Sequence, residues 1–259
     1  MFPSISSIHY YPVKSLSFSS LKKTSIKKNL GILNDRIFAF TRNIDFIRAN
    51  LFENSPKYRK LHNFLTLKNS PELNKYKFSY KNNQLIMHKG LLNIISISTK
   101  NSNNYKLLVD KLISLEKNLL NPIFLIKNKN YPFFDTTHSN NISNTVSLIN
   151  INSIIDFEKK IKQPIELERF RSNLYIDGID SWEERKWIDK IIKINKTYFK
   201  VQGHIARCSA TNLAPNTSES TINLPAALRK LYNHIEMGIY LTPLNDGELS
   251  VGDKILIDM

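Results

Sequence analysis

Cys208 is the only cysteine in this chain of 259 residues, so it cannot form a disulfide within the chain or build a thiolate zinc site by itself. A single reactive cysteine acts as a nucleophile, as a sulfur acceptor, or as one soft ligand to a metal that another molecule brings. His204 and Arg207 lie within four residues of Cys208, and nearby cations favour the thiolate form. The alternative is a free cysteine that packs as a small apolar side chain.

The chain is strongly basic, with 37 Lys and Arg against 22 Asp and Glu and a formal net charge of +15. Clustered cations are typical of nucleic-acid binding. Here most of the cations are lysines scattered singly among Asn, Ile and Ser, which argues against a nucleic-acid partner. Only nine of the 37 are arginines, the side chain that presents a planar fork to phosphate or carboxylate.

The hydrophobic share of 41% suffices for a globular core, in one large domain or two modest ones. No apolar run approaches the ~20 residues of a membrane span, and the first residues lack the layout of a signal peptide. A single cysteine agrees with a reducing compartment. We therefore expect a cytoplasmic protein without a membrane span.

Short strands dominate the predicted secondary structure. Alternating β-branched and aromatic residues predict strands over 5–13, 16–26, 37–41, 75–80, 84–88, 190–201 and 238–241, among others. Helices are predicted over 105–119, over 153–161 with Asn152 as the cap, and over 224–234 with Pro225 in the first turn. This pattern predicts a mainly β, barrel-like α+β fold with a few helices, and we place a boundary between two consecutive domains that share an interface near Pro122.

Five motifs in order resemble the MOSC family with its N-terminal β-barrel domain, including the mitochondrial amidoxime reducing component and the bacterial YcbX-type proteins. They are YPVKSL (11–16), GILNDR (31–36), RFRSN (169–173), ARCSAT (206–211) and LSVGDKI (249–255). The resemblance covers nearly the whole chain and implies an N-terminal β-barrel domain over 1–121 and a MOSC domain over 122–259.

The resemblance implies that the chain binds the molybdenum cofactor, a molybdenum ion held by molybdopterin, with Cys208 as metal ligand and catalytic residue. By position in the family pattern, the cofactor would meet residues from both domains at their interface. These are Lys14, Ser15, Arg36, Thr136, Thr137, Arg171, Asn173, Arg207 and Tyr240.

The implied activity is that of a molybdenum-dependent oxidoreductase, which reduces small N-hydroxylated substrates by oxygen-atom transfer. The chain lacks the cysteines that a fused iron–sulfur domain requires, so a separate electron-donor protein is expected. Three positions depart from the family pattern: Ser172 stands where Pro is usual, Ala206 where Ser is common, and residues 214–219 replace a DPDTGE-like run.

Two other functions stay open on the sequence. MOSC domains also occur attached to cofactor sulfurases, so Cys208 could instead carry a persulfide and act on a sulfur-containing substrate. Any pyridoxal phosphate would then belong to a partner, because this chain has no room for such a domain. The third hypothesis is a basic binding module, whose binding would depend steeply on salt and would not require Cys208.

Overall fold

The computed structural model describes residues 2–16, 19–134 and 145–257. The α-helices are α1 Phe46–Asn54, α2 Tyr105–Leu115, α3 Ile151–Ile161 and α4 Leu224–Tyr232. The 3₁₀ helices are η1 Pro56–Tyr58, η2 Leu61–Asn63, η3 Pro71–Lys75, η4 Ser102–Asn104, η5 Leu167–Phe170, η6 Glu183–Trp187 and η7 Ser209–Asn212. The strands are β1 Ser4–Tyr10, β2 Ser19–Leu21, β3 Lys23–Lys27, β4 Gly31–Ile32, β5 Phe38–Phe40, β6 Tyr76–Lys81, β7 Gln84–Lys89, β8 Leu92–Ser98, β9 Leu125–Lys127, β10 Val146–Asn150, β11 Leu174–Asp177, β12 Ile191–Ile194, β13 Thr197–Ala206, β14 Glu236–Pro243, β15 Gly247–Ser250 and β16 Ile255–Ile257.

The largest sheet has eight strands in the order β16-β12-β13-β14-β10-β11-β1-β2. Neighbours are antiparallel except for β10 and β11. An isolated bridge between Ser4 and Lys254 links the start of β1 to the β16 edge, so the sheet curls without closing completely. Its apolar side chains, such as Leu148, Phe199 and Ile239, form one buried core. The mainly β, α+β fold is confirmed, and the barrel-like expectation holds in this open form.

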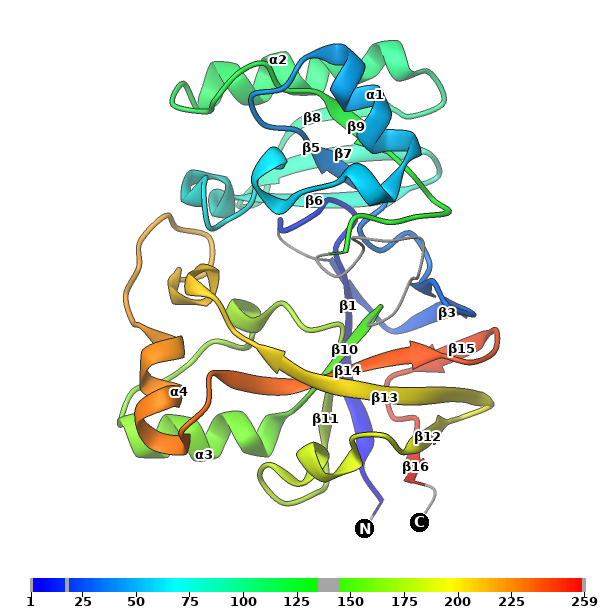
Figure 1. The fold of residues 1–259 in the computed structure, drawn as a ribbon, viewed down its shortest axis with the longest axis vertical. Coiled ribbons are helices and arrows are strands. Elements are labelled where there is room, and N and C mark those ends of the chain that lie inside the picture. The colour runs from blue at the N-terminus through cyan, green and yellow to red at the C-terminus, as the bar shows by residue number, and fades with distance from the viewer. Residues whose placement is uncertain (1, 17–18, 135–144, 258–259) are drawn as a thin grey trace.

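Strand pairing joins the beginning of the chain to its end. β1 pairs with β11, and β3 pairs with β15, so the first three strands belong to sheets completed by the last hundred residues. Figure 1 shows these strands in the lower part of the molecule, with both termini at the bottom. The division of the chain after residue 121 stays a proposal, and the paired strands cross it.

The upper part of Figure 1 contains α1, α2 and β5 to β9. Helix α2 and the strands β5 to β9 contribute to a second apolar core, whereas the buried residues of α1, Ala49 and Phe52, pack in a smaller cluster with Phe64 and Ile126. The hairpin of β6 and β7 turns at Asn82 and Asn83, both with positive φ, as a two-residue turn of this kind requires. Helix α2 ends at Leu115, four residues before its predicted end, because Glu116 leaves the helix and its carboxylate accepts from Tyr76 Oη at 2.6 Å and Lys75 Nζ at 2.8 Å.

Helices α3 and α4 pack on one face of the large sheet and share a third core with Tyr175 and Met237. The predicted cap of α3 was wrong by two residues. Asn150 is the N-cap and accepts from the Asn152 backbone N–H, while the Asn152 amide donates to Ile179 O at 2.8 Å. Helix α4 has Pro225 in its first turn, as predicted, and ends at Tyr232 because Asn233 adopts a left-handed conformation.

Candidate functional site

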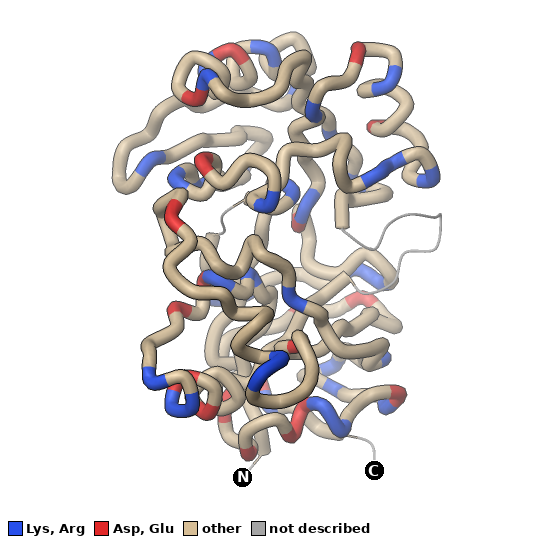
Figure 2. Tube along the Cα trace, turned by 60° about the vertical axis from the view of Figure 1, so that its left-hand side comes forward, with Lys and Arg blue, Asp and Glu red and all other residues tan. Residues whose placement is uncertain are grey.

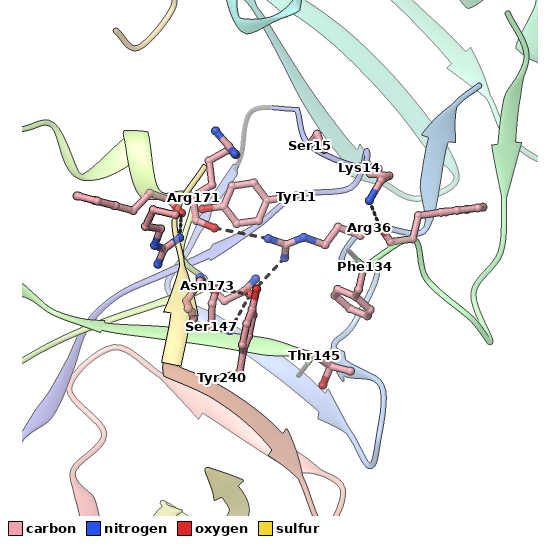
Figure 3. Close-up of a pocket in the computed structure, with 14 residues that line it drawn as sticks. Tyr11, Lys14, Ser15, Arg36, Phe134, Thr145, Ser147, Arg171, Asn173 and Tyr240 are labelled. Atoms are coloured by element: carbon pink, nitrogen blue, oxygen red, sulfur yellow. Dashed lines mark hydrogen bonds between the residues drawn. The ribbon is translucent and has the colours of Figure 1, made fainter. Parts of the chain in front are cut away.

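A polar cleft opens where the ends of the large sheet meet the segments that lead to the upper part of the molecule. It contains about 670 Å³ of space, including open solvent. Figure 3 shows its side chains converging from segments far apart in sequence. The lining residues are Tyr11, Lys14, Ser15, Arg36, Phe133, Phe134, Thr145, Ser147, Phe170, Arg171, Asn173, Ile205, Arg207 and Tyr240.

Seven of the nine residues that the resemblance implies for cofactor binding line this cleft: Lys14, Ser15, Arg36, Arg171, Asn173, Arg207 and Tyr240. The remaining two, Thr136 and Thr137, lie outside the described residues. The structure thus brings together all of the predicted cofactor residues that it describes. Their role as cofactor ligands stays a prediction.

Three of these residues have a left-handed backbone, with φ of 61° at Ser15, 52° at Arg36 and 47° at Arg171. Such a conformation costs a residue with a side chain about 1 kcal/mol or more, so it persists only where the surroundings enforce it. It turns the chain sharply where each of these segments meets the cleft. Strained backbone concentrated at one cleft is typical of a functional site.

Lys14 is a buried cation, with only 3% of its surface exposed. Its Nζ donates to Phe133 O at 3.1 Å and lies 5.8 Å from the centre of the Phe64 ring. An ammonium group has three donors, and one is accounted for by this carbonyl. The segment after β9 therefore holds Lys14 in place at the cleft wall.

The guanidinium of Arg36 lies across the middle of the cleft (Figure 3). It stacks over the Tyr11 ring at 4.4 Å and lies 5.7 Å from the Phe134 ring. It donates to Asn173 Oδ1 at 3.2 Å and to Arg171 O at 3.5 Å, and it forms an ion pair with Asp35, a fully buried carboxylate. Packing and hydrogen bonding together fix the plane of this fork.

Asn173 is the centre of a buried hydrogen-bond network. Its side-chain oxygen accepts from the backbone N–H of Ser147 at 3.1 Å and from the Ser147 hydroxyl at 3.0 Å. Its amide donates to His9 O at 3.2 Å and to Asp35 Oδ2 at 3.1 Å. Asn173 thereby ties β1 and β10 to the Arg36 segment.

Arg207 is a buried arginine whose guanidinium donates mostly to backbone carbonyls of the protein. It donates to Met237 O through Nε and Nη2 and to Phe170 O through Nη1. Burial lowers its pKa to about 10, so it stays cationic at neutral pH. Arg207 therefore contributes positive charge to the cleft and fastens the end of β13 to β14.

Cys208 is a free, exposed thiol that follows Arg207 directly. It stands at the start of η7, and its carbonyl accepts from the N–H of Thr211 at 3.0 Å and from the Thr211 hydroxyl at 2.8 Å. The buried, apolar alternative for this cysteine is wrong. Cys208 is exposed and follows the lining residue Arg207, although it is not itself one of the residues that line the cleft.

His204, the other cation expected to influence Cys208, has Arg185 and Glu236 as the charged neighbours that affect it. Burial is the main cause that lowers its pKa, and Arg185 lowers it further. His204 is therefore neutral at neutral pH and adds no positive charge beside Cys208.

The departures from the family pattern are accommodated locally. Ser172 is buried, its hydroxyl donates to Leu174 O at 3.2 Å, and its backbone N–H, which proline would lack, donates to Tyr175 Oη at 3.3 Å. The segment 214–219 is anchored from the upper part of the molecule, because the Asn74 amide donates to Ala214 O at 2.8 Å and to Thr217 O at 2.9 Å.

Several residues at the cleft were not predicted from the sequence. Thr145, Ser147, Tyr11, Phe133 and Phe134 line the cleft, and Asp35 lies buried behind it. Two of them were within reach of the motifs. Tyr11 begins YPVKSL and Asp35 precedes Arg36 in GILNDR, so the signal was present in the quoted stretches.

The charges in the cleft are one-sided. Four of its lining residues are Lys or Arg and none is Asp or Glu, while Asp35 lies buried behind Arg36. Unlike the cleft, the chain as a whole mixes both signs, as the view in Figure 2 shows over both parts of the molecule. An excess of cations over carboxylates in a cleft suits an anionic ligand such as a phosphate.

The donor set fits a phosphorylated, polar heterocyclic cofactor better than a bare metal ion. Within the described residues, no group of three or more His, Cys, Asp or Glu is placed to hold a metal. A metal at Cys208 would therefore need most of its ligands from the cofactor. The buried hydroxyl of Thr145, which has no hydrogen-bond partner among the described residues, also lines the cleft and could bond to such a ligand.

Comparisons with known proteins agree with these features. Residues 135–256 match the model of the MOSC domain. The chain is 27% identical over 115 residues to mitochondrial amidoxime reducing component 2 of Macaca fascicularis and 26% identical over 115 residues to that of Homo sapiens. Each match covers 40% of this chain and 34% of the relative, so the chain matches about a third of the length of these proteins.

Among solved structures, the YuaD protein from Bacillus subtilis aligns with 99% of this chain and 96% of its own, at 11% identity and a TM-score of 0.48. YiiM from Geobacillus stearothermophilus aligns with 44% of this chain and 54% of its own, at 16% identity and a TM-score of 0.36. No helix in the described ranges has the length and apolar character needed to cross a membrane.

Proposed function

We propose, from the premise that this chain carries a MOSC domain over residues 135–256, that it binds the molybdenum cofactor and works as an oxidoreductase on small N-hydroxylated substrates. The similarity to amidoxime reducing component 2 supports this reaction class. The observation that carries the proposal is the cleft itself, in which four cations converge without a lining carboxylate.

When bound, the cofactor would supply the removal of an oxygen atom from the substrate, with electrons from a separate donor protein. Lys14, Arg36 and Arg171 would hold its phosphate by charge and hydrogen bonds. Ser15 and Tyr240 would bond to the polar edges of its pterin, and Asn173 would support the site by holding Arg36. Phe133 and Phe134 would exclude water from one side of the cleft.

Cys208 would supply the protein's thiolate to the metal. Cys208 is exposed, and the bonds from Thr211 to its carbonyl fix its backbone. The neighbouring Arg207 lines the cleft, so the thiol-bearing residue follows the cleft wall directly in the chain. The chain's own task is to hold, orient and shield the cofactor, because the redox chemistry belongs to the cofactor.

The test is the molybdenum and pterin content of full-length protein expressed in a host that makes the cofactor. We expect about one molybdenum and one pterin per chain in the wild type. Cys208→Ala and Cys208→Ser should lose most of the metal and all N-hydroxylamine reduction. Wild-type protein without molybdenum or pterin would contradict the proposal.

One observation favours a second candidate function. Cys208 is exposed and is not a lining residue of the cleft, which suits a cysteine that receives sulfur from a partner. In that role its thiolate would attack a donor persulfide, accept the outer sulfur and release the donor thiolate. Cyanide-labile sulfur on wild-type protein that lacks molybdenum, and its absence from Cys208→Ala, would establish this alternative.

A further inference from the structure

The carboxylate of Asp35 lies directly behind the cleft and has no exposed surface. Two cleft residues donate to its Oδ2 atom: Arg36 through Nη1, in an ion pair, and Asn173 through its amide at 3.1 Å. The other oxygen, Oδ1, accepts from the Tyr11 backbone N–H at 2.6 Å. One buried side chain thus receives hydrogen bonds from three segments that form the cleft.

The same three residues are also bonded to one another. The Nη1 of Arg36 reaches Asn173 Oδ1 at 3.2 Å, and the Tyr11 ring packs 4.4 Å from the Arg36 guanidinium. The triangle of Asp35, Arg36 and Asn173 leaves each donor little freedom to rotate. Because Arg36 also has a left-handed backbone at 52°, its side chain is directed into the cleft by local strain as well as by this triangle.

Only a carboxylate satisfies all three donors. A neutral amide of the same shape has one acceptor oxygen, so it can face Tyr11 N–H or the pair of Arg36 and Asn173, and it places an N–H group against the other side. Burial raises the pKa of Asp35, and the Arg36 charge together with the hydrogen bonds from Tyr11 and Asn173 opposes this rise.

We propose that Asp35 is a positioning residue, which fixes the Arg36 guanidinium, directly and through Asn173, in the orientation that binds the cofactor. This inference rests on the proposed function for the identity of the ligand. Asp35 does not line the cleft, so it acts through the two residues that it holds.

The variant that tests the proposal is Asp35→Asn in the full-length protein, purified from a host that makes the cofactor. The chain offers a matched control in Asp156→Asn. The Asp156 carboxylate likewise accepts from three donors, Trp182 Nε1 at 2.7 Å, Tyr232 Oη at 2.8 Å and Lys160 Nζ at 3.0 Å, but none of these residues lines the cleft.

The first readout is the rate at which molybdenum and pterin leave the protein, followed by gel filtration over time. Loss of a residue that orients the ligand-binding groups should speed release by about 10- to 100-fold in Asp35→Asn. Asp156→Asn should release molybdenum and pterin at the wild-type rate, even if its melting temperature falls as much as that of Asp35→Asn. Equal release from Asp35→Asn and the wild type would overturn the proposal.

The second readout does not depend on the cofactor. Side-chain NMR of Arg36 in apo protein, from a host that cannot make the cofactor, reports whether its guanidinium is held. We expect the Arg36 Nε–H signal to shift or broaden in Asp35→Asn and to stay unchanged in Asp156→Asn. An unchanged Arg36 signal in Asp35→Asn would refute the positioning role.

These readouts separate the two proposals. Wild-type protein without cofactor would contradict the proposed function, and the Arg36 signal would then decide the positioning role alone.

If Asp35→Asn does not fold, Asp35→Glu takes its place, because it keeps the charge but moves the carboxylate by one methylene group. Wild-type release and an unchanged Arg36 signal in a folded Asp35→Glu would also overturn the inference.

Discussion

The cleft and a second charged region beside it differ in how their charges are matched. We call that region the paired cluster, defined by Asp156, Lys160, Arg185 and Glu236. It contains two ion pairs, Lys160 with Asp156 at 3.0 Å and Arg185 with Glu236 at 2.8 Å. The cleft has four lining cations and no lining carboxylate.

This difference separates charged residues that stabilise the fold by pairing with one another from charged residues that are available to bind a ligand. Each cation of the paired cluster has a carboxylate partner, so the cluster needs no outside anion. In the cleft, the buried Asp35 pairs with Arg36, and the remaining excess of positive charge suits a bound anion. Strand β14 connects the two regions, because Glu236 belongs to the paired cluster and Tyr240 to the cleft.

The largest effect is expected from Gly238→Ala, which would disturb both regions through β14. Gly238 has φ of 81°, and a Cβ there would lie 2.4 Å from Leu148 O and 2.5 Å from Ile149 Cγ1. Strain and overlap together should cost about 2–5 kcal/mol of unfolding free energy. Thermal unfolding should show a fall of roughly 5–15 °C.

Gly203→Ala is the matched control for this substitution. Gly203 lies in the neighbouring strand β13, and a Cβ at that position would meet no atom within 4 Å. We expect its melting temperature to stay within about 3 °C of the wild type. Equal melting temperatures for the two alanine variants would show that β14 does not require glycine at Gly238.

A smaller effect is expected when one arginine is neutralised in the cleft and, in a separate variant, one in the paired cluster. Only the cleft variant should lose cofactor. Arg36→Gln removes one of the four lining cations and leaves the buried Asp35 carboxylate without its ion pair, and should weaken cofactor retention by about 100-fold. Arg185→Gln removes the partner of Glu236 and should change retention by less than about threefold. Molybdenum per chain after matched dialysis measures both, and similar losses in the two variants would erase the distinction between the regions.

The smallest effect concerns pH and arises beside the paired cluster. Burial and then Arg185 lower the pKa of His204, with Glu236 opposing, and its Nδ1 has no hydrogen-bond partner among the described residues. The folded state therefore favours neutral His204. Its contribution to stability is complete above the ordinary histidine pKa of about 6.5 and is lost as pH falls towards the lower folded value.

Unfolding by urea at pH 8 and pH 5.5 measures this contribution. We expect His204→Gln to reduce the loss of stability on acidification by less than about 1 kcal/mol, with no change in the cofactor content at pH 8. A pH dependence identical to that of the wild type would assign the acid sensitivity to other groups, such as His234, whose pKa burial also lowers.

The sequence predicted the cleft better than it predicted the elements around it. Lys14, Arg36 and Arg171 were identified by their positions in motifs that resemble a known family. Asp35 was missed because its importance depends on burial and on Asn173, a partner 138 residues away. Ser147 was missed because serine is common here and carries no signal of its own.

The elements that were mispredicted are those that tertiary contacts decide. Strand β8 was not predicted, because its first residues are exposed and the alternation of buried and exposed side chains is irregular. Two asparagines at the start of α3 suit a cap equally well by type. The position of Ile179 decides between them, because its carbonyl accepts from the Asn152 amide.

The pairing of β1 with β11 also determines when the cleft can form during synthesis. Ser4 lies opposite Asp177, so the first strand to leave the ribosome waits for more than half of the chain before it finds its partner. Lys14 and Arg36 reach their places only after Asn173 has been made. Until then β1 has only β2 as a partner, and its other edge is a partly apolar strand edge open to chaperones and to aggregation.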